Sequence, residues 1–578
     1  MAGGPAVWRA TFPGSGLRHS EELGAKPADS ALAELAEVAL QCRTPSPVCP
    51  GRQGWSPARS RRRASRGTRA APPSTARGLL VGASPPRPSS SSAPQPAAGA
   101  ATGHEVRQAA RAPSAHVSPE RPRGARAVAA PGSAAGWLEH VRCLQSAAGP
   151  SELAECARAL QHLPTADTTS PALRAAVLWL FEAGLSKGVW RATYAHTLAT
   201  SVAAHPLLLA DRAVRVRASA LLDAGAADEH TFRNLACVNQ HLGAQGKLQL
   251  HTARFWAEVE RRGVRALAAS DTDQAPRFLA VLAHRAATLA SAGAGPPPGP
   301  ALWMQVERAA AEHGAHMDGQ QVSNFLWACG KLSRGGNTSC LPRGMARYVL
   351  LDAVASRAGS MSAHAVSLTL WALAALHIRL EEPQRRPLLR AFAKSSASMA
   401  PQAVSNSAWA FAKLGLRLRG QHLLCLQAAI ARTAPAMQPQ HVSNTTWALA
   451  KAALPLPVEL MCAAERSAVH LKPQELSSLL WALAEASQPP SPLLRSALLT
   501  EVTRAAHVLN TQQVANIVWA LGAPAMQGKM NTELRAAVLA ALERTAVEML
   551  PIGQRMAKQG AERLGWPLPD SLRSTLLV

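Results

Sequence analysis

The sequence predicts an all-α protein, an α-solenoid in which helix pairs stack one on the next, preceded by a disordered N-terminal region. Two observations carry this prediction. Tryptophan recurs in register, with intervals of 44, 38, 38, 34 and 38 residues between Trp327, Trp371, Trp409, Trp447, Trp481 and Trp519. The stretches between them are rich in Ala and Leu, which are strong helix formers. A period of about 38 residues is typical of solenoids.

Each Trp lies inside a motif of fixed spacing. A Val or Leu precedes it by five residues and an Ala follows it in all six copies. Seven residues before it lie Gln320, His364, Gln402, Gln440, Gln474 and Gln512. Three residues before it lie Asn324, Leu368, Asn406, Asn444, Ser478 and Asn516. Six copies that keep this phase indicate one repeated structural unit.

The motif also shows where each helix begins. Three copies carry a proline that suits the first helical position, because its missing N–H is no loss there: Pro401, Pro439 and Pro473. The residue before it is then the N-cap. In the copies without proline the caps are Asp318, Ser362 and Asn510, whereas the proline copies have the poor caps Ala400, Gln438 and Lys472. A Met or Leu before each cap and the Val or Leu at the fourth helical position predict a hydrophobic staple.

Second helical stretches alternate with the Trp helices. They cover residues 386–399, 422–437 and 491–509, so residues 301–550 are predicted as six helix pairs with a continuous core. Residues 137–291 are predicted as degenerate repeats over 150–160, 193–203, 231–243 and 275–287. In these, Arg158, Ala199, Cys237 and Ala283 would take the place of Trp. Residues 291–300 are predicted as a loop, and residues 551–578 as a C-terminal tail that repeats nothing.

Residues 1–135 are predicted to be disordered. They are rich in Arg, Ser, Pro and Ala, and no acidic residue occurs from Gln41 to His104. An Arg-rich, acid-poor N-terminus resembles an organellar transit peptide. Two alternatives remain: a nuclear localisation signal at Arg61–Arg63, or a solvated basic tail.

The charge balance points to an anionic partner. The chain has 61 Lys and Arg against 36 Asp and Glu, a net charge of +25. Residues 1–135 hold 18 basic and 7 acidic residues, so residues 136–578 hold 43 and 29, a net +14. A basic helical body favours nucleic acid or an anionic membrane surface.

The same composition argues against other classes of protein. Nine cysteines without a C-x-x-C pair argue against a zinc site or a disulfide framework. No apolar run is long enough to span a membrane. Because no phosphate-binding loop, nucleophile elbow or metalloprotease motif is found, neither enzymatic activity nor a cofactor is expected.

A helical wheel predicts the part of the repeat that would bind RNA. With Trp in a broad apolar arc, the Gln, the Asn and the residue four after Trp share one narrow polar stripe. Lys on this stripe would neutralise phosphates, and the amides would meet bases, with the variable position six before Trp, for example Ala403, tuning the choice of base. The candidate RNA-binding residues are Gln320, Asn324, Lys331, Gln402, Asn406, Lys413, Gln440, His441, Asn444, Lys451, Gln474, Gln512, Gln513 and Asn516.

Each of these residue types also has a structural interpretation. Asn repeated in register can form a ladder between turns, Gln near a helix start can cap it, and Lys can simply be solvated. The Trp residues are expected in the core rather than stacked on bases. The stripe as a whole therefore supports binding better than any single member does.

The segments PQAVSNSAWAFAKLG (401–415), PQHVSNTTWALAKAAL (439–454) and QQVSNFLWACGKL (320–332) resemble the octotricopeptide repeat family. The resemblance covers residues 301–550 well and 137–291 weakly. It implies a chloroplast or mitochondrial protein that binds organelle transcripts and supports their translation, processing or stability, with other RNA-processing or translation proteins as further partners. Some members end in a RAP domain, which is not found after Leu550. His364, Leu368 and Ala375 depart from the stripe, which puts base reading by that repeat in doubt.

The alternative function is a protein-binding scaffold of the HEAT or armadillo kind without RNA binding. It would use the same solenoid surface to hold an acidic peptide. Salt-dependent binding of single-stranded RNA, without binding of a generic acidic peptide, separates the two.

Overall fold

The computed structural model describes residues 133–145, 149–164, 170–186, 192–293, 299–336, 340–528 and 530–576. These residues form helices and connecting turns with no strand. The expectation of a disordered N-terminal region with a targeting signal falls on residues outside this part of the chain.

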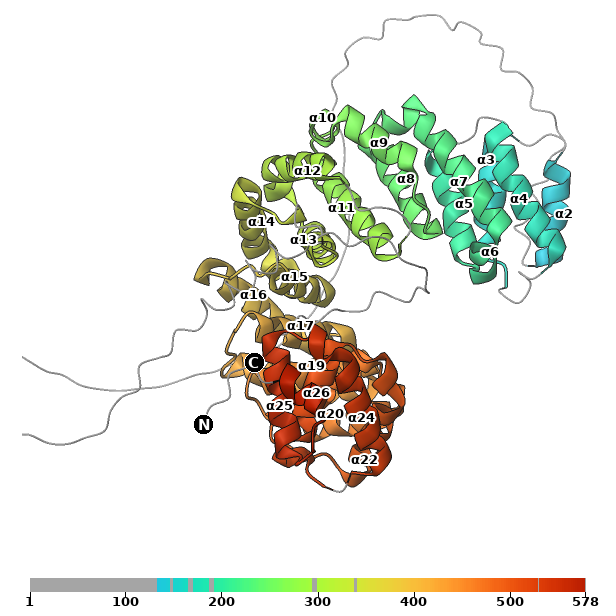
Figure 1. Cartoon of the computed structure of the whole chain (residues 1–578). Coiled ribbons are helices and arrows are strands. Elements are labelled where there is room, and N and C mark those ends of the chain that lie inside the picture. The colour runs from blue at the N-terminus through green and yellow to red at the C-terminus, as the bar shows by residue number, and fades with distance from the viewer. Residues whose placement is uncertain are drawn as a thin grey trace, which may run out of the picture. The chain divides into compact units, whose positions relative to one another are not determined.

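One layer of helices contains all six phased Trp residues, and we call it the Trp layer (Figure 1). Its helices are α3 (Pro150–Leu160), α5 (Ala192–Ala203), α8 (Leu235–Leu248), α11 (Ala275–Ser291), α13 (Gly319–Arg334), α15 (Ala363–Ala375), α17 (Pro401–Lys413), α19 (Pro439–Lys451), α21 (Pro473–Glu485), α23 (Thr511–Leu521) and α25 (Pro551–Arg563). Each helix packs against the next one in this series. The degenerate copies predicted from sequence coincide with α3, α5, α8 and α11.

The second layer alternates with the Trp layer along the chain. Its helices are α2 (Ala134–Leu144), α4 (Pro171–Ser186), α7 (Arg212–Ala227), α9 (Ala253–Arg262), α10 (Val264–Ser270), α12 (Pro300–His313), α14 (Gly344–Arg357), α16 (Glu382–Ser395), α18 (Gln421–Thr433), α20 (Val458–Ser467), α22 (Pro492–Ala505) and α24 (Thr532–Thr545). These helices also pack in sequence order. The short helices α6 (Pro206–Ala210) and α26 (Asp570–Thr575) lie outside the two series. The predicted α-solenoid of helix pairs is thereby confirmed.

The Trp-layer helices begin where the motif predicts. Asp318 accepts the amides of Gln320 and Gln321, each at 2.8 Å, and Ser362 accepts the amide of Ala365 at 3.2 Å. The Met or Leu before each cap is buried in all six copies. Because a short 3-10 turn and then this Met or Leu precede each cap, the chain reverses from one layer to the other in the same way in each of these repeats.

Basic residues of the second layer tie successive repeats together. Arg432 donates to the carbonyl oxygens of Ser396 (3.1 Å) and Met399 (2.8 Å) in the preceding 3-10 turn. Arg544 makes the equivalent pair of bonds further along the array, and Lys394 donates to one such carbonyl. Part of the positive charge of the helical body therefore has a structural role.

The Trp residues form a column through the Trp layer. Trp371, Trp409, Trp447 and Trp481 are buried, as predicted. Ring centroids of Trp371 and Trp409 lie 6.4 Å apart, with the two ring planes at 28°. Two aromatic rings in this arrangement attract each other beyond the area that they bury.

The two Trp residues at the ends of the phased series are only half-buried, which differs from the prediction. The ring centroid of Trp327 lies 4.8 Å from that of His284 on α11. The imidazole is smaller than an indole, so Trp327 is only partly covered. Trp519 faces α25, which has no Trp, and its indole N–H donates to Gln559 at 3.1 Å. Each end of the column is therefore closed by a polar side chain.

The predicted C-terminal tail is wrong for residues 551–563. This segment forms α25, which packs against α23 as the preceding members of the layer pack on each other. Gly560 lies where the other copies have Ala, and a Cβ added there would lie 2.3 Å from the carbonyl oxygen of Val518. The sequence pattern missed this repeat because α25 has Gln559 and Gly560 where the other copies have Trp and Ala. Gly560 allows the backbones of α25 and α23 to approach closely.

The register of the degenerate repeat in α8 is also corrected. Trp447 is the ninth residue of α19, whereas Cys237 is the third residue of α8. The ninth residue of α8 is Gly243, and the ring of His196 lies against it. Over residues 301–550 one cluster of buried apolar residues is continuous, as predicted, whereas at α8 the core divides, because that helix contributes to two clusters.

Candidate nucleic-acid interface

The helices α13 and α19 leave a narrow edge unburied at the position of the predicted polar stripe, whereas α15, α17, α21 and α23 are unburied mainly near their ends. On α19 that edge consists of Pro439, Gln440, His441, Asn444 and Lys451, all half-buried. The rest of that helix is buried because it packs against α17, α21 and the second layer.

The Gln row lies at the start of each helix. Gln320 and Gln402 are exposed, whereas Gln440, Gln474 and Gln512 are half-buried. Within one helix, Gln320 donates to Asn324 at 2.9 Å. Neighbouring side chains of the stripe can therefore orient one another.

The Asn row is more deeply placed. Asn324 and Asn444 are half-buried, whereas Asn406 is 8% exposed and Asn516 is 2% exposed. The side-chain nitrogens of Asn444 and Asn516 are buried without a hydrogen-bond acceptor among the described residues. No hydrogen bond between Asn side chains of successive repeats is described in this part of the chain. Since buried donors normally find a partner, these amides suit an acceptor on a ligand.

In four of the six phased copies the variable position six before Trp caps its own helix. The side chains of Gln321, His441, Glu475 and Gln513 accept the backbone N–H of their own N-cap at 3.0, 3.3, 2.9 and 3.0 Å. Gln513 also donates to Gln474 across the repeat boundary at 3.4 Å. Sequence reasoning missed this role, although an acceptor three residues after a cap is the mark of a capping box.

Cationic side chains run beside the Trp column. The Lys413 ammonium lies 5.9 Å from the ring centroids of both Trp409 and Trp447. The Arg334 guanidinium lies 5.9 Å from Trp371 and 5.6 Å from Trp409. Arg334 was not a predicted site residue, because it follows Trp327 by seven residues and no other copy has a basic residue there.

Several of these cations are partly desolvated. Burial, followed by the nearby charge of Arg334, lowers the pKa of Lys331, and burial lowers the pKa of Arg334 to about 10. Burial also lowers the pKa of Lys451, against the opposing effect of Glu485. A cation that has lost water gains from an anion placed beside it.

Acidic residues are segregated from this surface. The helices α5, α8, α11, α13, α15, α17 and α19 contain no Asp or Glu, but together they carry seven Lys and Arg: Lys247, Arg277, Arg285, Lys331, Arg334, Lys413 and Lys451. The series ends at α21, where Glu475 and Glu485 appear and Glu485 takes the Lys position.

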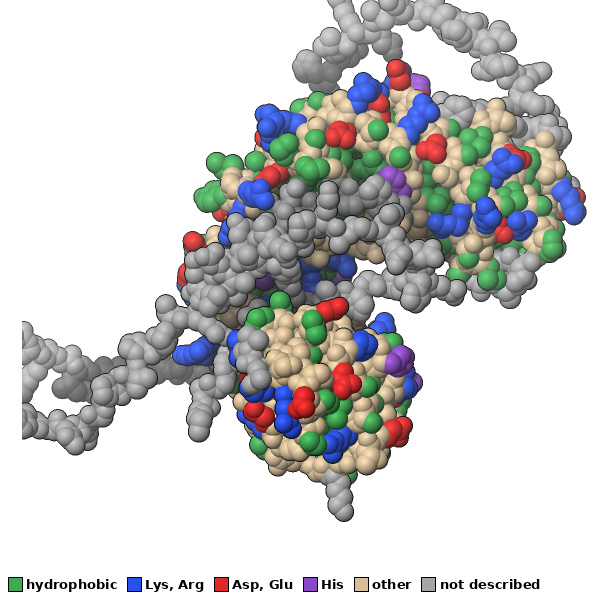
Figure 2. Space-filling view, in the orientation of Figure 1, with side chains coloured by type: hydrophobic (Ala, Val, Ile, Leu, Met, Phe, Trp, Pro, Cys, Tyr) green, Lys and Arg blue, Asp and Glu red, His purple; other side chains and the backbone are tan. Residues whose placement is uncertain are grey.

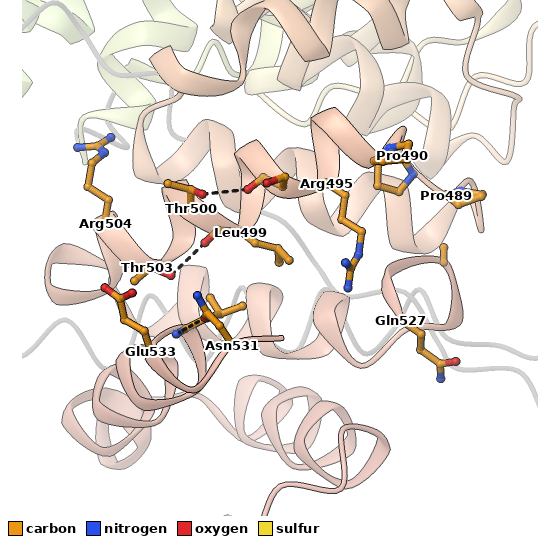
Figure 3. A pocket seen from close by; sticks show the side chains of 14 residues that line it. Pro489, Pro490, Arg495, Leu499, Thr500, Thr503, Arg504, Gln527, Asn531 and Glu533 are labelled. Carbon is orange, nitrogen blue, oxygen red and sulfur yellow. Dashed lines mark hydrogen bonds between the residues drawn. The ribbon is translucent and has the colours of Figure 1, made fainter. Parts of the chain in front are cut away.

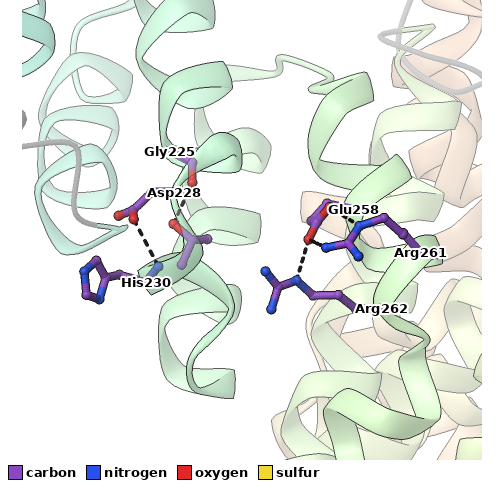
Figure 4. Close-up of polar contacts among 7 residues, drawn as sticks. Gly225, Asp228, His230, Glu258, Arg261 and Arg262 are labelled. Carbon is purple, nitrogen blue, oxygen red and sulfur yellow. Dashed lines mark hydrogen bonds and ion pairs between the residues drawn. The ribbon is translucent and has the colours of Figure 1, made fainter.

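Ion pairs between described residues lie in the second layer or in α26. Figure 4 shows one group, in which Arg261 donates to Glu258 at 2.8 Å and Arg262 also pairs with that carboxylate. The hydrogen bond from Arg261 is the main reason that the pKa of Glu258 falls to about 2. On the face drawn in Figure 2, Lys and Arg side chains are interspersed with Asp and Glu. The second layer thus mixes both signs of charge, although its helices hold 22 basic against 14 acidic residues.

A separate groove of about 920 Å³ lies between α22 and α24 (Figure 3). Arg495, Thr503 and Glu533 are among its lining residues, and none of the predicted site residues lines it. The Thr500 and Thr503 hydroxyls donate to carbonyls one turn earlier in their own helix. These two hydroxyls are therefore already engaged within their own helix.

Among the described residues, no group of side chains could hold a metal ion, and each helix is too short or too polar to cross a bilayer. No family model and no curated protein matches the sequence. Among solved structures, the chain is similar to one from "Homology model of the full-length AP-3 complex in an intermediate open conformation", with a TM-score of 0.26 and 10% identity over 74% of this chain and 82% of that one. So low a TM-score supports no inference about function.

Proposed function

We propose that the protein binds single-stranded RNA along the exposed edge of the Trp layer and acts on organelle transcripts after transcription. The observation that supports this proposal most is the separation of charge. Seven consecutive Trp-layer helices lack acidic residues and carry half-buried cations, whereas the helices of the second layer mix basic and acidic residues. Such a one-signed strip suits a polyanion that runs along the repeats.

The two kinds of side chain on the strip would divide the work. Lys331, Lys413 and Lys451, with Arg334, would contact phosphates and supply affinity that is independent of sequence. Gln402, Asn406 and their counterparts would meet base edges, because amides both donate and accept. The buried Trp rings would not stack on bases but would hold the cations in place through their faces.

Binding of a short single-stranded RNA to the full chain, measured over a range of salt concentrations, tests the proposal. Removal of one cation that binds a phosphate should reduce the slope of log affinity against log salt by about 0.7. We expect this for Lys331→Ala and Lys413→Ala, but not for Arg386→Ala or Arg390→Ala, exposed residues of α16 in the second layer. Equal effects in both pairs would mean that the strip is not the binding surface.

The scaffold alternative predicts a different outcome from the same reagents. An acidic peptide would then bind at least as well as RNA and would respond to the same lysines. Affinity for the peptide without affinity for RNA would reject RNA binding.

The organelle assignment rests on the resemblance to the octotricopeptide repeat family and on the composition of residues 1–135. A fusion of residues 1–135 to a fluorescent protein tests it. Signal in chloroplasts or mitochondria supports the assignment, while nuclear or diffuse cytosolic signal rejects it.

A further inference from the structure

A second group of basic side chains lies on the Trp layer outside the phased repeats, where α5, α8 and α11 pack together. His196 comes from α5, Lys247 from α8 and Arg285 from α11. Lys247 and Arg285 both act on His196, whose pKa is lowered first by burial and then by Lys247. The positive charges of Lys247 and Arg285 therefore act at His196, and no carboxylate is among the causes of the pKa shifts of His196 and Arg285.

Two glycines make room for this group. A Cβ added at Gly246 would lie 2.2 Å from Nη1 of Arg285, and one added at Gly243 would lie 2.9 Å from Nδ1 of His196. The two positions are one helical turn apart, so both side chains lie across the same face of α8. Glycine inside a helix is unfavourable, and here it admits the side chains of His196 and Arg285, which alanine would displace.

Polar atoms without partners converge on that face. Nδ1 of His196 and Nε of Arg285 are buried with no hydrogen-bond partner among the described residues. Both amide atoms of Asn239, one turn before Gly243 on the same face of α8, are in the same condition. Buried groups of this kind are normally satisfied in folded proteins, which favours a ligand that accepts hydrogen bonds and carries negative charge.

We propose that Arg285, Lys247, Asn239 and His196 form a binding site for one phosphate group, which anchors an RNA strand at the N-terminal end of the acid-free helices. The position supports this ligand, because α3, the next member of the layer, carries Glu152 and Glu155. The proposal deepens the RNA-binding function proposed above and rests on it for the identity of the strand. The phosphate belongs either to the end of the strand or to an internal linkage.

Gly246→Ala is the sharpest variant. Alanine favours the helix, and the clash is with the flexible end of Arg285, so α8 should stay folded while the guanidinium moves. Full-length wild type, Gly246→Ala, Arg285→Ala and the exposed second-layer control Arg254→Ala are compared for binding of RNAs that end in a 5′-phosphate, a 3′-phosphate or hydroxyls. Circular dichroism and thermal melts establish that each variant is folded.

We expect affinity to fall about tenfold or more in Gly246→Ala and Arg285→Ala, but not in Arg254→Ala. A terminal phosphate is the ligand if wild type prefers one phosphorylated RNA and the variants lose that preference. An internal linkage is the ligand if all three RNAs lose affinity equally and the salt slope falls. Unchanged RNA affinity in folded variants, with loss in Lys413→Ala, would overturn the anchor while leaving RNA binding intact.

A ligand independent of RNA separates failure of this site from failure of the proposed function. Stabilisation of the chain by inorganic pyrophosphate, relative to chloride at equal ionic strength, is measured by thermal melting. Loss of that stabilisation in Gly246→Ala supports the site even if RNA does not bind. Absence of any pyrophosphate effect in wild type, together with no RNA effect of the variants, refutes it.

Discussion

Replacing Trp409 by Ala tests how the repeat array is held together. Trp409 is 2% exposed, lies in ring contact with Trp371 and has Arg334 and Lys413 over its faces. Truncation of a buried Trp costs about 3–5 kcal/mol, since it removes apolar burial and leaves a cavity. In a solenoid this loss should be local, because each repeat contacts only its neighbours.

Hydrogen exchange resolved by peptide is the appropriate assay. The free energy of opening should fall by about 3–5 kcal/mol in α15, α17 and α19, and change little in α5 and α8. Trp519→Ala is the matched comparison and should cost less, because that ring is only half-buried. A loss below about 1 kcal/mol, or a loss spread evenly over all helices, would refute the account of the Trp column.

Three more predictions concern single side chains. His241 is fully buried against Phe255, and burial lowers its pKa from 6.5 to about 3. As pH drops from 6.5 toward 3, the imidazole is protonated in the unfolded chain before it is protonated in the folded one. The free energy of unfolding should therefore fall over this range, by up to about 5 kcal/mol. His241→Phe should remove that component in urea titrations at pH 7 and pH 4, and an unchanged pH dependence would contradict it. Arg432→Ala should lower the stability of the repeats around α18 by about 1.5–3 kcal/mol in the same titrations, whereas no change would mean that its two carbonyl contacts are not stabilising. His441→Glu should keep the helix cap, as Glu475 does in the next repeat, and should alter one position of the RNA motif recovered by selection; an unchanged motif would assign that side chain to capping alone.

The fold was predictable because its signals are local and repeated. Proline at the first helical position, caps such as Asp318 and the buried Met before them each specify a helix start from a few adjacent residues. Eleven Trp-layer helices follow the same plan, and ten of them were anticipated. The eleventh, α25, was missed because its contact with α23 depends on Gly560 and so on a distance between backbones that no local pattern expresses.

The candidate site was predictable only in part. The wheel places Gln440, Asn444 and Lys451 on one edge, because position on a helix follows from spacing alone. Arg334 and the group around Arg285 were missed, since their neighbours come from other helices and have no fixed offset in sequence. The predicted register of α8 was wrong for the same reason. Gly243 takes the place of Trp there because it accommodates His196 from another helix, and such a contact cannot be read from the spacing of residues within one repeat.

Capping by the residue six before Trp limits how well a repeat can distinguish nucleotides. One atom of that side chain is already committed to the cap amide, so only the remaining atom is left for recognition. Gln321 keeps an N–H donor, Glu475 keeps an acceptor, and an Ala such as Ala403 offers neither. The side chain at this position can therefore present a hydrogen-bond donor, an acceptor or neither. These three options are too few to distinguish four bases. A repeat that selects a single base would need a second informative side chain, and the amide one turn away on the stripe is in place to supply it.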